Sequence, residues 1–178
     1  PFLGLTGMGG GVASLMWAGA GEVGNTIWLA GRNVYGAFGL NNDTPGYSSP
    51  TQISDVTDWL AFQNKNFNHC LGIRGVNGSA EDTNGTLWGM GQQGSWGELG
   101  LNDRTSRSSP TQVGTDSTWA KLSVGSNVVA TKSNGTLWVW GHNANGSIGD
   151  NSNVPRSSPM QVGTDTNWDA DKIQISNG

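Results

Sequence analysis

Residues 134–149 read N-G-T-L-W-V-W-G-H-N-A-N-G-S-I-G, and the chain carries two further versions of this stretch, at residues 84–100 and 24–39. Each version has an Asn/Gly pair, then a short run with a tryptophan, then a loop with three spaced glycines. Downstream of each loop stands S-S-P-x-Q with Ile or Val, followed by a lone tryptophan. The opening tryptophans, Trp28, Trp88 and Trp138, lie 60 and 50 residues apart. A period of this length predicts stacked supersecondary units.

Each unit is expected to contain short antiparallel strands. An Asn134-Gly135 pair between two β-prone runs predicts a hairpin with a type I′ turn, and Asn84-Gly85 is expected to do the same. The spaced glycines predict turns with positive φ. A proline at the start of the last strand of each unit would not break a ladder. The predicted strands form three sets: 3–6, 12–17, 26–30 and 51–53; 61–63, 70–74, 86–90 and 111–113; 121–124, 128–132, 136–140 and 160–162. A further strand is predicted over 172–176.

These patterns predict one all-β repeat domain over residues 1–178. The expected units cover approximately residues 1–58, 59–118 and 119–167, and residues 168–178 would begin a fourth. The closing tryptophans recur with the same spacing as the opening ones, so all six are interpreted as structural. They are Trp28, Trp88, Trp138, Trp59, Trp119 and Trp168.

The string G-T-L-W-V-W-G-H-N-A-N-G-S-I-G at residues 135–149 resembles the repeats of the regulator of chromosome condensation family, and residues 85–100 and 26–39 resemble them too. The usual core of that family is G-x-L-[YW]-x-W-G-x-N-x-x-G-Q-L-G. The resemblance implies a β-propeller of four-stranded blades. The sequence motif at residues 107–119 and 156–168, R-S-S-P-x-Q-V-G-T-D-x-x-W, is similar to the bacterial and phage versions of these repeats. The glutamine that precedes the final Leu-Gly of the family core is replaced in this chain by Ala37, Glu98 and Ser147.

The resemblance does not carry the founder's nucleotide-exchange activity to this chain. That activity depends on a full ring, a projecting wedge and a basic tail, which the sequence does not display. We therefore expect no enzyme and no catalytic residue.

Three blades are too few for a ring, since propellers usually have four to eight. Three blades would leave apolar faces and a sheet edge open. We therefore expect a longer propeller, a six-bladed ring of two chains, or docking on another protein, so the partner is a protein or a second copy. A β-trefoil is the alternative fold, since it also has three units of four strands. Its repeats are nearer 40 residues and carry Q-x-W, whereas Gln112 and Trp119 lie seven apart.

The composition excludes several classes of function. Thirteen acidic and nine basic residues give a net charge of −4 without a basic cluster, which argues against nucleic-acid binding. The sequence contains no apolar run of 18 residues, so no membrane span is predicted. No cofactor or metal site is predicted, because no His, Cys and carboxylate grouping has ligand spacing. His69 and Cys70 are neighbours on opposite strand faces and cannot form a nucleophile–base pair. The loop acids are interpreted as solubilising side chains; they are Asp43, Glu98, Asp103 and Asp150.

Residues that break the repeat are the candidates for function. Tyr35, Trp96 and Asn145 occupy one loop position of the three copies, and Tyr47 and the insertion Val76–Thr83 are further departures. Exposed aromatic side chains are typical of contacts with proteins or sugars. Packing on a neighbouring blade is the other interpretation. We expect a non-catalytic structural or protein-interaction module of a phage virion or bacterial surface assembly, located in a virion, outside the cell or at its surface. A carbohydrate-binding, lectin-like module is the alternative.

Overall fold

The computed structural model describes residues 2–6, 12–17, 26–65, 68–78 and 82–168 of the 178-residue chain. The elements in these residues are twelve strands and one short 3-10 helix. They are β1 (Phe2–Thr6), β2 (Val12–Trp17), β3 (Thr26–Arg32), η1 (Val34–Gly36), β4 (Gly46–Gln52), β5 (Trp59–Lys65), β6 (His69–Gly75), β7 (Gly85–Gly91), β8 (Arg107–Gln112), β9 (Trp119–Val124), β10 (Asn127–Lys132), β11 (Leu137–Gly141) and β12 (Arg156–Val162). No helix among the described residues has the length and hydropathy to cross a membrane.

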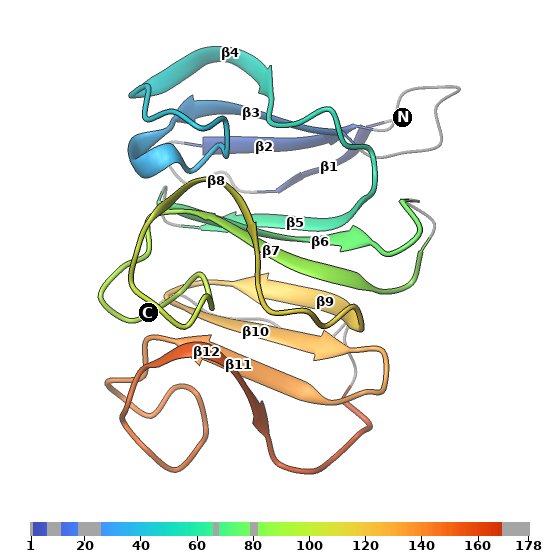
Figure 1. Ribbon diagram of the computed structural model, residues 1–178, viewed down its shortest axis with the longest axis vertical. Coiled ribbons are helices and arrows are strands. Elements are labelled where there is room, and N and C mark those ends of the chain that lie inside the picture. Colours follow the sequence, from blue (N-terminus) through green and yellow to red (C-terminus); the bar gives the residue numbers. More distant parts are fainter. Residues whose placement is uncertain (1, 7–11, 18–25, 66–67, 79–81, 169–178) are drawn as a thin grey trace.

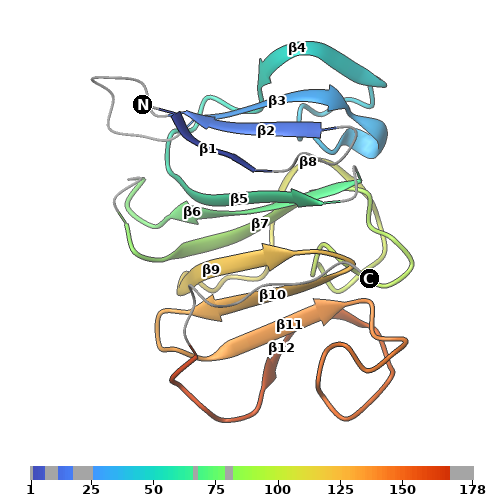
Figure 2. The same ribbon diagram turned by 180° about the vertical axis from the view of Figure 1, so that it is seen from behind.

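The strands form three antiparallel groups of four, taken in chain order: β1–β4, β5–β8 and β9–β12. We call them the first, second and third blades. The second and third blades are joined by one residue pair, Gly85 with Trp119, and otherwise have separate ladders. Figures 1 and 2 show the three blades stacked along the longest axis of the molecule. The all-β architecture predicted from the repeat is confirmed.

The position of the prolines differs from the prediction. Pro50, Pro110 and Pro159 lie inside β4, β8 and β12, not ahead of them. Thr51 lies opposite Leu29 and Tyr47 lies opposite Gly31, so the outer strand uses four residues to pass two of its partner. The same irregularity recurs in the other two blades. A bulge on an outermost strand accommodates a proline, because the missing N–H has no ladder partner there.

The two Asn-Gly hairpin predictions are also wrong in detail. Only Gly135 has positive φ at the β10–β11 turn, so the turn is not type I′. The Asn134 side chain instead accepts hydrogen bonds from the backbone N–H and hydroxyl of Thr136, at 3.2 and 2.7 Å. Gly85 already belongs to β7 and pairs with Gly75, so the inserted residues make that connection. The predicted Gly24-Asn25 turn and the strand over 172–176 lie outside the described residues.

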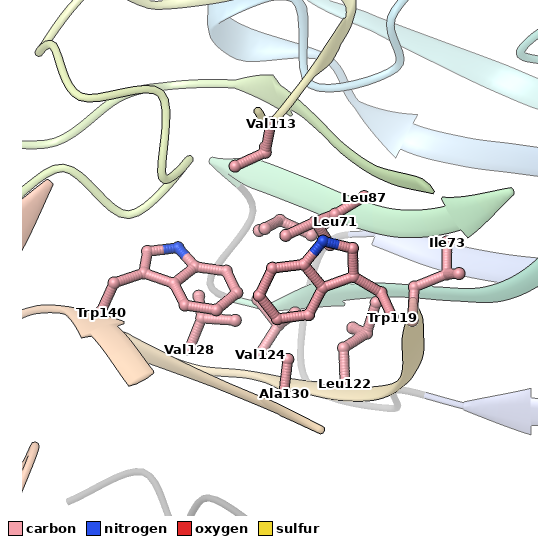
Figure 3. Packing of buried hydrophobic residues seen from close by; sticks show 10 residues of the cluster. All are labelled: Leu71, Ile73, Leu87, Val113, Trp119, Leu122, Val124, Val128, Ala130 and Trp140. Carbon is pink, nitrogen blue, oxygen red and sulfur yellow. The ribbon is translucent and has the colours of Figure 1, made fainter. Parts of the chain in front are cut away.

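Two apolar clusters fill the spaces between consecutive blades. The cluster between the first and second blades contains Trp59 and Phe38, and the one between the second and third contains Trp119 and Trp140. Figure 3 shows the Trp119 and Trp140 rings side by side in this second cluster. The closing tryptophans Trp59 and Trp119 are 1% and 3% exposed, whereas Trp168 is 41% exposed. Burial of one tryptophan contributes about 4–6 kcal/mol as an upper bound, so these residues are a main source of contact between blades.

A basic side chain bridges the opening and closing tryptophans in two blades. The Arg74 guanidinium lies 5.0 Å from the Trp88 ring and 5.8 Å from the Trp59 ring, and Asp58 holds it at 2.9 Å. Lys132 occupies the corresponding place in the third blade, 3.6 Å from the Trp138 ring. Cation–π contact adds to the area burial of the rings. The cation–π contacts of Arg74 and Lys132 therefore stabilise the second and third blades.

Candidate functional site

Three related loops join the third and fourth strands of the blades and lie along one edge of the molecule, on the left in Figure 1. They cover residues 33–45, 92–106 and 142–155. Each loop is organised around a buried amide side chain that accepts a hydrogen bond from a backbone N–H five or six residues later. The three pairs are Asn33 with Phe38 at 2.8 Å, Gln93 with Leu99 at 2.6 Å, and Asn143 with Ile148 at 3.0 Å.

The amide nitrogens of the same side chains hold the far side of each loop. Asn143 donates to the backbone carbonyls of Ser152 and Val154, at 3.0 and 3.1 Å. Gln93 donates to the carbonyl of Asp103 at 2.5 Å. The sequence analysis missed these residues. The available signal was their place two residues after a glycine at or next to the end of each third strand, namely Gly31, Gly91 and Gly141.

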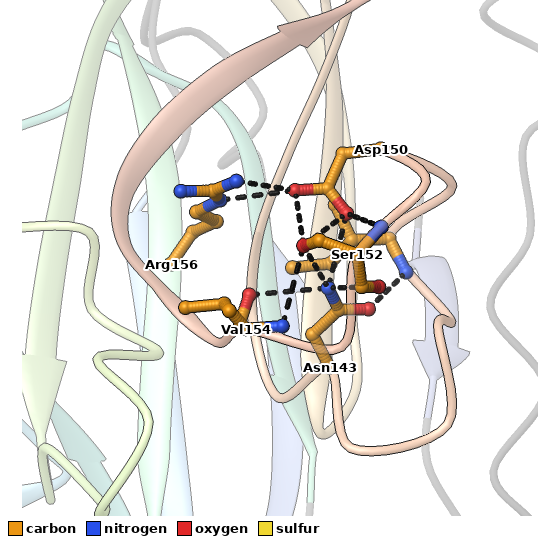
Figure 4. Close-up of polar contacts among 6 residues, drawn as sticks. Asn143, Asp150, Ser152, Val154 and Arg156 are labelled. Carbon is orange, nitrogen blue, oxygen red and sulfur yellow. Dashed lines mark hydrogen bonds and ion pairs between the residues drawn. The ribbon is translucent and has the colours of Figure 1, made fainter.

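Asp103 and Asp150 are each tied to a residue of their own loop and to the arginine that begins the following strand. Asp150 accepts hydrogen bonds from Arg156, Ser152 and Asn143, as Figure 4 shows. Arg156 first, and then Ser152, hold the pKa of Asp150 at about 2. In the second loop Arg107 pairs with Asp103 at 2.5 Å, and the pKa of Asp103 is lowered, mainly by the backbone N–H of Thr105. These carboxylates therefore serve the loop geometry.

Glu98 differs from Asp103 and Asp150 in the direction of its pKa shift. Burial raises the pKa of Glu98 above the usual range, although backbone N–H groups of its own loop act in the opposite direction. Its backbone carbonyl accepts a hydrogen bond from Trp140 Nε1 at 2.9 Å, which links the second loop to the third blade. Within the described residues, no three His, Cys, Asp or Glu side chains gather closely enough to hold a metal ion.

His69 and Cys70 are both buried in β6 and lie on different sides of the second blade. Burial lowers the pKa of His69 to about 4, while a hydrogen bond with the backbone of Gly125 in the third blade opposes the shift. Cys70 belongs to the cluster between the first and second blades, and burial raises the pKa of its thiol to about 12. A neutral imidazole and a protonated thiol that face apart do not form a nucleophile and its base.

Three of the predicted contact residues reach the same edge of the molecule. Tyr35 is 49% exposed with φ of 61°, Trp96 is 40% exposed, and Asn145 is exposed in the third loop. The Trp96 ring packs edge-on to His142, with 4.5 Å between ring centroids.

The other two departures from the repeat lie elsewhere. Tyr47 is half-buried, stacks on Phe38 at 5.4 Å and donates to Asn42 Oδ1, so it packs within the first blade. The described residues of the insertion Val76–Thr83, 76–78 and 82–83, lie next to β6 and β7 at the opposite edge, on the right in Figure 1. The structure therefore does not bring these two together with Tyr35, Trp96 and Asn145.

The first two loops also receive the outer strand of the next blade. The Asn41 backbone N–H donates to the carbonyl of Ser108 in β8 at 2.6 Å. A Cβ on Gly36 would lie 2.5 Å from Ser108 Cα, so only glycine admits this strand. Gly39 lies against Pro110 in the same contact. We call the two glycines and the asparagine of each loop a glycine slot; the first slot is Gly36, Gly39 and Asn41.

The second slot repeats this contact one blade further on. The Asn102 N–H donates to the carbonyl of Ser157 in β12 at 2.7 Å, and a Cβ on Gly97 would overlap Ser157. Asn41 and Asn102 both adopt positive φ, a conformation that asparagine tolerates. The S-S-P segment of one blade thus docks in the glycine slot of the blade before it.

The comparisons with known proteins support the fold. No family model matches the sequence, and no curated protein matches it. Human WBSCR16 matches the structure with a TM-score of 0.61 and 19% identity, over 86% of this chain and 37% of that chain. Prp20p from Saccharomyces cerevisiae matches with a TM-score of 0.66 and 15% identity, over 88% and 37%. Yeast RCC1 (Prp20) bound to Kap60 matches with a TM-score of 0.68 and 16% identity, over 88% and 36%.

The chain thus spans little more than a third of the length of these structures. Identities of this size show similarity of fold alone. They agree with the propeller prediction from the repeats, and not with the β-trefoil alternative. The chain is built from antiparallel β-propeller blades similar to those of the regulator of chromosome condensation proteins.

Proposed function

We propose that this chain is a non-catalytic propeller module that makes protein–protein contacts through the loop edge carrying Tyr35, Trp96 and Asn145. The exposure of these three side chains at equivalent points of consecutive blades is the observation that supports the proposal. Two neighbouring acids, Asp103 and Asp150, are held by hydrogen bonds within their own blades, so these carboxylates serve the loop geometry.

The similar structures are consistent with a protein as the partner class. Prp20p is described with binding properties to Gsp1p and histones, and yeast RCC1 (Prp20) is bound to Kap60. We extend only the class of partner to this chain. The sequence of its S-S-P segments, which is similar to phage and bacterial versions, favours a structural role in a virion or a bacterial surface assembly.

Site-specific photocross-linking tests this proposal. A photoreactive amino acid is placed at Tyr35 or at Trp96, and at Val76 as the control. Val76 is 45% exposed but directly follows the end of β6 that pairs with the start of β7, whereas the loop edge lies beyond the end of β7. In the native assembly we expect protein adducts of one defined mass at the first two positions and none at Val76. Equal adducts at all three positions, or no adducts, would contradict the proposal. Glycan binding that is lost in Trp96→Ala would support the carbohydrate-binding alternative.

A further inference from the structure

The third glycine slot has the same residues as the first two but no described strand in it. Gly146, Gly149 and Asn151 correspond to Gly36, Gly39 and Asn41. All three third-slot residues have positive φ, so the slot is already in its receiving conformation. No described atom lies within 4 Å of a Cβ placed on Gly149. The glycines of the first two slots are buried, whereas Gly146 is half-buried and Gly149 is exposed.

An open pocket marks the place of the missing strand. It is lined by Gly146, Gly149, Asn151, Ser152 and Asn153. The backbone N–H of Asn151 is at the position from which Asn41 and Asn102 donate to a serine carbonyl. The pocket is therefore shaped by a contact that the chain itself makes twice.

One S-S-P segment of the chain is free to fill such a slot. Ser48, Ser49 and Pro50 of β4 are all exposed. The corresponding residues Ser108 and Ser157 are half-buried, because each lies in the slot of the preceding blade. The described chain thus has an unfilled slot at one end and an undocked segment of matching sequence at the other.

The apolar face beside the third slot is also incompletely covered. Leu137 and Val162 are half-buried, whereas their counterparts Leu87 and Val113 in the second blade are buried. Trp168 is 41% exposed, in contrast to the buried Trp119. A further blade on this face would cover these side chains, as the third blade covers those of the second.

We propose that the third glycine slot binds Ser48-Ser49-Pro50 of a second copy of this chain, with the Asn151 N–H donating to the Ser48 carbonyl. The proposal rests on the proposed function, since it names the partner for the open end of the module. A contact between different surfaces of two copies closes into a ring or continues into a filament. Two copies of the three described blades supply six blades, a number within the usual range for a closed propeller.

Light scattering combined with sedimentation over a range of concentrations tests the association. We expect the wild-type chain to reach twice its 18.6 kDa mass. Ser48→Arg places a large side chain on the docking segment, and Gly146→Ala adds a Cβ to the slot. Each of these two substitutions should raise the dissociation constant of the dimer at least about tenfold, because a substitution at the centre of an interface typically has an effect of this size. Ser158→Arg is the matched control, because Ser158 stays exposed even though its neighbour Ser157 is docked.

Hydrogen exchange identifies the surface that is used. The Asn41 and Asn102 amides should be protected at every concentration, whereas protection of the Asn151 amide should appear only with association and be lost in Ser48→Arg. Circular dichroism and urea unfolding confirm that the variants fold. A monomer at all concentrations, or a dimer in which Asn151 exchanges as fast as in the monomer, would overturn the inference.

The two proposals fail separately. A monomer that still forms protein adducts at Tyr35 and Trp96 would overturn only the second-copy inference. A dimer with a protected Asn151 amide and no protein adducts at Tyr35 and Trp96 would overturn only the proposed function.

Discussion

The buried amide of Asn143 should carry the stability of the third loop, and Asn143→Ala tests this directly. The side chain is fully buried, accepts one hydrogen bond from the Ile148 N–H, and donates to the carbonyls of Ser152 and Val154. Alanine removes these three bonds and the bond from Asn143 to Asp150 at once. A hydrogen bond contributes about 1 kcal/mol net, and a buried group left without a partner costs about 1–3 kcal/mol. We therefore expect a loss of about 3–4 kcal/mol from the free energy that holds this loop closed.

Asn145→Ala is the matched control for this change. Asn145 lies in the same loop, two residues away, and is exposed. Its replacement should alter stability by less than about 0.5 kcal/mol.

Two measurements separate a global effect from a local one. Urea unfolding followed by tryptophan fluorescence reports the free energy of unfolding of the whole chain, and hydrogen exchange at the Ile148 amide reports opening of the loop alone. If only the loop opens, exchange at Ile148 should accelerate in Asn143→Ala while the urea midpoint changes little. Equal exchange at Ile148 in the two variants would refute the assignment of this amide as the centre of the loop.

Three further predictions test the packing between blades. Burial lowers the pKa of His69 from its ordinary value of 6.5 to about 4. As pH falls, the unfolded chain therefore takes up a proton at this histidine before the folded chain does. The free energy of unfolding should consequently drop between pH 6.5 and 4, by up to about 3 kcal/mol. Urea midpoints across this range check it, and a profile unchanged by His69→Gln would contradict it. Trp119→Ala should cost about 3–5 kcal/mol and Trp168→Ala far less, since Trp168 is 41% exposed; comparable thermal shifts would argue against this. Gly36→Ala and Gly146→Ala strain the backbone alike, at φ of 70° and 69°, but within one chain only a Cβ at residue 36 meets Ser108. Denaturation of the dissociated chain should therefore show the larger loss for Gly36→Ala, and equal losses would mean that the slot contact is weak.

Most of the fold could be predicted because the repeat constrains the sequence three times. The tryptophan spacing located the strands, and the alternation of apolar residues placed the inner strands to within one or two residues. The edge strands were predicted too short, because a proline was interpreted as a boundary. The bulge that accommodates Pro50 depends on its partner strand, and a single-strand pattern does not contain that information.

The site was less predictable for a related reason. Tyr35, Trp96 and Asn145 were selected because they interrupt the repeat, and all three are exposed on the loop edge. Tyr47 was selected by the same rule although it packs on Phe38. The buried amide of Asn143 follows the repeat and was passed over. Hydrogen bonding across a loop links residues five to eleven apart, and no periodic pattern of hydropathy reports it.

A residue that recurs in every repeat builds the architecture only where its neighbour is present. Gly146 and Gly36 have the same identity and nearly the same φ, yet a Cβ on Gly36 meets Ser108 while Gly146 borders an open pocket. Ser48 and Ser108 likewise share sequence and strand position but differ in burial. In the two proposals, residues that depart from the repeat make the contact along the loop edge, whereas residues that match the repeat make the contact at the two ends of the stacked blades. Binding surfaces in a repeat protein are therefore to be sought both where the copies differ and where identical copies lack their neighbour.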